Sequence, residues 1–126
     1  MRRSQRGAAV VDFVLVMTLL VPLVLGILQV GLVLHVRNTL TSAASEGARV
    51  AGTYNREPAD GAARTRALIT TSLSGRYATD VVATQTDVGG YPGVEVVVQA
   101  SVPALGLLGP GVELTVSGHA VEEALP

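Results

Sequence analysis

The sequence predicts an α+β protein in which a long N-terminal transmembrane helix extends into a small helical region packed on a short antiparallel sheet of about three strands. Three observations predict this class. A basic leader precedes a long apolar run, the next segment repeats small residues at helical spacing, and the last third of the chain alternates apolar and polar residues. Outside the apolar run, the 126-residue chain has enough residues for one small domain and not for two.

The apolar run from Phe13 to Leu34 contains 22 residues without a formal charge. As a helix rising about 1.5 Å per residue, it covers roughly the 30 Å hydrocarbon core of a bilayer. Arg2, Arg3 and Arg6 precede the run, so the positive-inside rule predicts a cytoplasmic N-terminus and an extracytoplasmic C-terminal part. The run is longer than the apolar core of a cleavable signal and lacks a small-x-small site after it, so we expect it to be retained.

Two helical patterns follow the apolar run. Small and apolar residues recur at helical spacing in the first pattern, at Leu40, Ala44, Gly47 and Ala51. This spacing predicts that the membrane helix continues into water with a face that allows close packing. Ala62, Ile69 and Leu73 then mark a short amphipathic helix that starts near Pro58 and ends at Gly75.

The last third of the chain has the two-residue period of strands. Apolar residues alternate with mostly polar ones over residues 94–102 and again over 112–120, and residues 79–88 are rich in Val and Thr. We assign the segment from Gly89 to Gly93 to the connection between the first two strands. The apolar segment 105–111, LGLLGPG, has two interpretations: a connection whose leucines pack on the core, or an exposed tip for a neighbouring subunit or the membrane surface.

Composition and charge exclude several functional classes. The segment after Leu34 carries six arginines and nine acidic residues, and this mildly acidic balance argues against a nucleic-acid partner. The absence of cysteine excludes disulfides and thiolate metal sites. No glycine-rich phosphate loop follows a strand and no His/Asp cluster has metal-ligand spacing, so we expect no cofactor, no metal and no small-molecule substrate.

The sequence does not indicate an enzyme. His35 lies at the membrane edge, and His119 shares one strand face with Ser117 and Glu113. That face could suggest acid–base chemistry, but alternating polar residues on a sheet are far more often solvated. The pair Arg64 and Arg66 is interpreted as an exposed helix face. We therefore assign no catalytic residue.

The start of the chain resembles a known type of processing signal. A basic leader ends at Gly7, four small or apolar residues follow, and Asp12 and Phe13 come next. This order resembles type IV prepilin-like signals and, in particular, the TadE-like family of tight-adherence pilus pseudopilins. The similarity extends through GILQVG at residues 26–31 into the helix with small residues.

The resemblance implies a function and a division of the chain. It implies that a prepilin peptidase cuts on the cytoplasmic side between Gly7 and Ala8 and leaves the apolar helix attached. Residues 1–7 would then be a leader, 8–37 a transmembrane helix and 38–126 an extracytoplasmic domain. By this resemblance the protein is a single-pass minor pilin, or an assembly subunit, of a Flp-type pilus or a related secretion apparatus. Its partners would be the membrane, the peptidase and other pilin or pseudopilin subunits.

Three residues are expected to act in assembly: Asp12, Phe13 and Gln29. Cleavage after Gly7 creates an ammonium group at Ala8, and Asp12 lies four residues later on the same helical face. The two groups can pair within one chain or between neighbouring subunits. The family usually has Glu at the position of Asp12 and often an acid at that of Gln29. The amide of Gln29 can hydrogen-bond between helices but cannot form an ion pair.

Two other classes of protein remain open on the sequence alone. One is an unprocessed single-pass envelope protein with a structural or binding role, in which Gly7 and Asp12 are incidental. The other is a secreted binding module whose first segment is an ordinary signal. The N-terminal residue of the mature protein separates the three, because it would be Ala8 for the pseudopilin, Met1 for the anchored protein and a residue beyond Leu34 for the secreted module.

Overall fold

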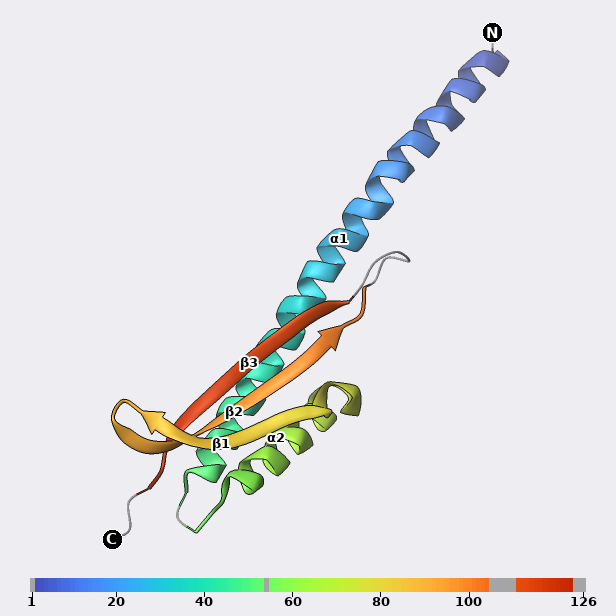
Figure 1. Ribbon diagram of the computed structural model, residues 1–126. Helices are drawn as coiled ribbons and strands as arrows, with labels where there is room; N and C mark the ends of the chain where they lie inside the picture. The colour runs from blue at the N-terminus through green and yellow to red at the C-terminus, as the bar shows by residue number, and fades with distance from the viewer. Residues whose placement is uncertain (1, 54, 105–110, 124–126) are drawn as a thin grey trace.

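The computed structural model describes residues 2–53, 55–104 and 111–123 and confirms the α+β class. Figure 1 shows a long helical rod, α1, with a small body packed around its second half. The elements in chain order are α1 (Arg2–Ala51), α2 (Pro58–Ser72), the 3-10 helix η1 (Gly75–Ala78), β1 (Asp80–Val88), β2 (Tyr91–Val102) and β3 (Val112–Val121). The loop residues 105–110, for which the sequence left two interpretations, lie outside the described residues.

The sheet is antiparallel with the order β1-β2-β3. A two-residue turn joins β1 to β2, because Val88 pairs directly with Tyr91. Both turn residues, Gly89 and Gly90, have positive φ, which a type I′ hairpin needs and glycine allows without strain. The connection is therefore shorter than predicted, and Gly93 belongs to β2.

The helices cover one face of this sheet and form the core with it. The inward residues of β2 are all buried: Val94, Val96, Val98, Ala100 and Val102. The stripe of small and apolar residues predicted on α1 is also buried. Because its side chains are small, α1 and α2 can approach each other closely. A Cβ added at Gly47 would lie 1.8 Å from the Thr65 hydroxyl oxygen of α2. Small residues on α1 thus set the spacing between the two helices.

The closest approach between α1 and the sheet occurs at Gly118 of β3. A Cβ at this position would lie 2.4 Å from the backbone nitrogen of Ser45 and 2.5 Å from the carbonyl carbon of Ala44. The contact is with helix backbone, which cannot rotate away as a side chain can. Gly118 therefore fixes the height and angle of α1 over β3.

Helix α2 begins where the sequence predicted, at Pro58. The backbone N–H of Glu57 donates to the Asp60 carboxylate at 2.8 Å, which satisfies a donor at the helix start. The helix ends at Ser72, three residues before the predicted Gly75, because the chain there tightens into η1. Arg66 of α2 donates to the carbonyl oxygen of Val81 at 3.0 Å, so it ties α2 to β1.

The core of the body includes residues of α1 that precede Arg37, and the predicted division at residue 37 stays a prediction. Leu32 and Val33 pack against the core, and Val36 is fully buried. The domain thus uses residues from the end of the apolar run, while the first half of α1 projects alone (Figure 1). Where the bilayer itself ends along this helix stays a prediction.

Candidate functional site in the membrane helix

The first half of α1 is apolar and uncovered. Most large side chains from Val10 to Val30 are exposed; Phe13 has an exposed fraction of 63% and Leu19 of 76%. Soluble monomers rarely expose a continuous apolar surface of this extent. Within the described residues, Gln5–Ala51 is the one helix long and apolar enough to cross a membrane, and none of its most apolar window is buried. Lipid or other apolar helices must cover this surface.

The uncovered segment has the length of a bilayer core. The stretch from Ala8 to Leu28 lies between the predicted processing position and the first contact with the chain's own domain. At a rise of about 1.5 Å per residue, it measures roughly 31 Å, close to the roughly 30 Å of hydrocarbon in a typical bilayer. The helix thus fits a bilayer between its predicted mature N-terminus and its domain.

Gly7 lies inside α1, yet the fold gives no reason for a glycine there. Its φ is not positive, and a Cβ would meet nothing within 4 Å. Glycine inside a helix costs up to about 1 kcal/mol relative to alanine. Gly47 and Gly118, in contrast, are required by close packing. The packing of the described chain therefore does not account for glycine at position 7.

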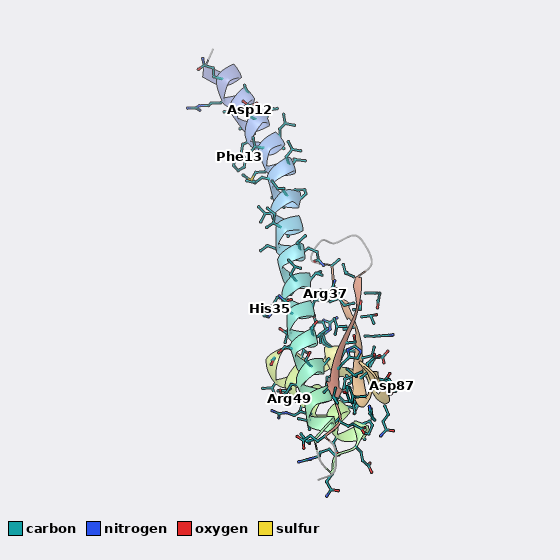
Figure 2. All side chains as sticks on the ribbon, turned by 90° about the vertical axis from the view of Figure 1, so that its left-hand side faces the viewer. Asp12, Phe13, His35, Arg37, Arg49 and Asp87 are labelled. Atoms are coloured by element: carbon teal, nitrogen blue, oxygen red, sulfur yellow. The ribbon has the colours of Figure 1, made fainter. Side chains whose placement is uncertain are left out.

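Asp12 and Phe13 lie near the far end of the bare helix, away from the sheet (Figure 2). Both residues are exposed. Asp12 accepts no hydrogen bond and forms no ion pair with any described residue. A lone carboxylate near the end of a membrane helix is unfavourable unless it reaches the headgroups or meets a cation. The structure leaves this carboxylate available for a partner outside the chain.

Gln29 has a partner that sequence reasoning missed. Its amide nitrogen donates to the carbonyl oxygen of Pro103 at 3.4 Å, and the residue is half-buried. This bond ties the bare half of α1 to the chain just after β2. The two residues are 74 positions apart, so no local pattern could have indicated the contact. The predicted role of Gln29 between subunits stays a prediction.

An open apolar groove lies on the uncovered helix. It is lined by Pro22, Leu23, Gly26, Ile27 and Val30. Gly26 resembles Gly7 in that a Cβ there would meet nothing within 4 Å. Small residues on membrane helices let a second helix approach closely. The groove and the bare surface around it can therefore accept another helix.

The two histidines considered for catalysis, His35 and His119, are both exposed. The His119 ring nitrogen lies 2.5 Å from the Glu95 carboxylate across the outer face of the sheet. Both side chains are open to solvent, which suits a surface cross-strand pair. His35 is exposed on α1. In the described part of the chain, no group of three or more His, Asp or Glu side chains could hold a metal ion. The absence of enzymatic activity stays a prediction.

Comparison with known families finds a match for most of α1. A family model described as TadE-like protein matches residues 7–49. The segment is TadE-like. The match starts at Gly7 and ends at Arg49, so it covers nearly all of α1 and neither α2 nor the sheet. It confirms the resemblance drawn from Gly7, Asp12 and Phe13. No curated protein and no solved structure matches the chain.

The TadE-like segment has two environments in the structure. Its first half is the bare apolar helix, and its second half packs on α2 and the sheet. Membrane localisation fits both the family match and the single candidate span. The family relationship thus concerns the part of the chain that enters the membrane and supports the domain.

Proposed function

We propose that this protein is a minor pilin, or pseudopilin, of a tight-adherence pilus or related secretion apparatus, anchored by α1 and processed between Gly7 and Ala8. The observation that carries the proposal is the start of α1, where a glycine that the fold does not need precedes a bare apolar helix of bilayer length. The TadE-like match begins at this glycine.

The proposed orientation follows from charge. Arg2, Arg3 and Arg6 are the only charged residues before Asp12. Basic residues beside a membrane span are retained in the cytoplasm, so the leader faces the peptidase on the inner side. The body formed by α2 and the sheet then lies outside the cytoplasm, where it can contact other subunits.

Cleavage would give the helix a new charged end. The Ala8 ammonium lies one helical turn before Asp12, and a carboxylate near a helix start also complements the helix dipole. An acid and an amine that pair in the interfacial region neutralise each other at the point where the helix enters lipid. Asp12 would thereby hold either its own N-terminus or that of a neighbouring subunit during assembly.

The N-terminal residue of the mature protein tests this proposal. The full chain is co-expressed with a prepilin peptidase, and the membrane fraction is analysed by N-terminal sequencing and intact mass. We expect a chain that starts at Ala8 and remains in the membrane. A Met1 start would instead support an unprocessed anchored protein, and a start beyond Leu34 would support a secreted module.

A pair of glycine variants provides the matched control. Gly7→Val and Gly31→Val both add a branched side chain to α1 at a position with nothing within 4 Å of a Cβ. We expect Gly7→Val to block cleavage while Gly31→Val is cleaved like the parent. Equal cleavage of both variants would show that Gly7 is not recognised by the peptidase.

A further inference from the structure

One end of the body lies beside the bare half of α1. Strand β2 runs toward the N-terminal half of the helix and ends there, and β3 starts back from the same place (Figure 1). We call this the β2–β3 end, and its described residues are Pro103, Ala104, Gly111 and Val112. The Gln29 amide donates to the carbonyl oxygen of Pro103, so this end lies at the level of residue 29 on α1.

The length of the apolar helix places this level at the edge of the bilayer core or slightly inside it. If the hydrocarbon core starts at Ala8, roughly 30 Å of helix ends near Leu28, one residue before Gln29. If the core instead starts at Phe13, it ends near Leu34, and the level of Gln29 lies about 7.5 Å inside it. Both placements bring the β2–β3 end into contact with lipid.

The side of α1 that the body leaves uncovered also suits lipid at this level. Val30 and Leu34 have exposed fractions of 60% and 54%. No Asp, Glu, Lys or Arg occurs from Phe13 to Val36. Lipid around Val30 and Leu34 removes these apolar side chains from water, and it then extends past the level of Gln29.

The β2–β3 end carries no charge, unlike the opposite end of the body. From Val102 to Val112 the sequence contains only Val, Pro, Ala, Leu and Gly. The opposite end, below the sheet in Figure 1, carries the charged residues Arg56, Glu57, Asp87, Glu122 and Glu123. Charged groups are unfavourable in the apolar part of a membrane, so the body has the polarity expected when its β2–β3 end faces the bilayer.

The backbone of Pro103 is suited to an apolar medium. Proline has no backbone N–H, so this residue has only a carbonyl group to satisfy. That carbonyl accepts a hydrogen bond from the Gln29 amide at 3.4 Å. In water the carbonyl would need no protein partner, whereas an unpaired carbonyl in lipid is unfavourable. The bond thus fits a strand end that meets lipid.

Glu113 limits how far this end can enter the membrane. It is exposed and pairs with Ser101 across the sheet, two residues before Pro103 on β2. At roughly 3.3 Å per residue, its level on the sheet is about 7 Å from that of Pro103, on the side away from the bare helix. An end that enters by no more than this depth can rest at the boundary of headgroups and acyl chains while Glu113 stays in water.

We propose that the β2–β3 end rests in the headgroup region of the leaflet on the C-terminal side of the span, with Pro103, Ala104 and Val112 in contact with lipid. The bilayer is then a second support for the body besides α1. The contact restricts the tilt of α1 in the membrane. The membrane anchoring of α1 rests on the proposed function, and the position of the end beside Gln29 rests on the structure.

Lipid-attached quenchers test the contact, because the chain has no cysteine of its own. Ala104→Cys and Val112→Cys carry a fluorescent label at the β2–β3 end. Leu20→Cys carries it on the bare helix, and Asp87→Cys carries it at the far end of the body (Figure 2). Full-length chains are reconstituted in phosphatidylcholine vesicles with and without lipids that bear a doxyl quencher, either near the headgroup or deep in the acyl chain.

The labelled positions separate a body that contacts lipid from a body that stands clear of it. We expect the headgroup-level quencher to act severalfold more strongly at Ala104→Cys and Val112→Cys than at Asp87→Cys. Quenching at the two end positions no stronger than at Asp87→Cys would overturn the proposal, while deep quenching at Leu20→Cys would still report an inserted helix. Loss of quenching at Leu20→Cys as well would overturn both this contact and the membrane anchor of the proposed function.

Two valines on β3 provide a matched pair of charge variants. Val112 and Val121 lie at opposite ends of the strand and have exposed fractions of 39% and 49%. Val112→Glu places a carboxylate where we propose lipid, so quenching of the label at Ala104→Cys should fall to the level of Asp87→Cys. Val121→Glu adds the same charge at the far end and should leave quenching unchanged. Unchanged quenching with Val112→Glu, or an equal loss with Val121→Glu, would overturn the contact.

Processing is measured separately from this contact. The quenching experiment uses chains made without a peptidase, so cleavage after Gly7 does not affect it. A Met1 start after co-expression with the peptidase, together with quenching at the β2–β3 end, would contradict processing and support the contact. An Ala8 start without quenching at this end would support processing and contradict the contact.

Discussion

At the residue scale, Asp12 has the clearest mismatch between its chemistry and its surroundings. It is the only acidic residue before Glu46 in the sequence. Its carboxylate has no partner among the described residues and lies one helical turn after Ala8. A charge of this kind near the membrane is unfavourable unless it is neutralised, which is the reason to expect an amine beside it.

The change Asp12→Asn tests this pairing with little change in shape. We expect membrane insertion to be unaffected, because an amide is more easily accommodated than a charge. Co-purification of two differently tagged copies from membranes should fall by about tenfold, as expected for the loss of roughly 1–2 kcal/mol between helices. Asp12→Glu, which keeps the negative charge, should retain co-purification. Equal recovery with Asp12→Asn would argue against the ion pair.

Gln29 shows that a sequence pattern can indicate a hydrogen bond without identifying its partner. A polar residue in an apolar run indicates a hydrogen bond, but the run does not say with which partner. The structure provides the carbonyl oxygen of Pro103, so Gln29→Ala should lower the free energy of unfolding by about 1 kcal/mol. Urea unfolding in detergent micelles measures this change. If instead stability is unchanged and co-purification of tagged copies falls, Gln29 acts between subunits.

At the element scale, the position of α1 depends on a glycine in a distant strand. Gly118→Ala should lower the free energy of unfolding by roughly 1–3 kcal/mol, because its Cβ would press on the backbone of Ala44 and Ser45. Gly31→Ala is the matched control, since it adds the same methyl group where nothing lies within 4 Å. The control should be neutral or slightly stabilising. Thermal unfolding in micelles compares the two, and equal stability would show that α1 can shift without cost.

The elements themselves could be predicted because their local patterns are strong. Alternation over residues 94–102 identified the central strand, and the spacing of Leu40, Ala44 and Gly47 identified the buried face of α1. The closeness of Gly118 to α1 could not be predicted, because it depends on how the sheet meets the helix. The packing of Leu32 on the core could not be predicted either, since an apolar residue that faces a core looks the same in sequence as one that faces lipid.

The candidate processing signal could be recognised in the sequence because its residues lie close together along the chain. Gly7, Asp12 and Phe13 form a local arrangement, and the family match begins at the first of them. The exposed side of α1 that carries Ser42 and Ser45 could not be predicted, because these serines look like ordinary solvated residues in the sequence. Which side of α1 the sheet covers is known only from the tertiary structure (Figure 1).

At the scale of the whole molecule, α1 is both the membrane anchor and a structural element of the domain. Its 50 residues correspond to about 75 Å of continuous helix, of which only the outer part packs on the sheet. A continuous helix transmits position from the membrane to the body without a flexible linker. The depth of the helix in the bilayer therefore sets the height of the body above the membrane.

Orientation in the membrane is the prediction on which this arrangement depends. Ser4→Cys lies in the basic leader and Ser117→Cys on the exposed face of β3, so the two thiols should lie on opposite sides of the bilayer. In spheroplasts of a host without a prepilin peptidase, a membrane-impermeant maleimide should label Ser117→Cys directly and Ser4→Cys only after permeabilisation. The reverse pattern would place the leader outside, away from a cytoplasmic-side peptidase. Labelling of both before permeabilisation would show that α1 does not span the membrane.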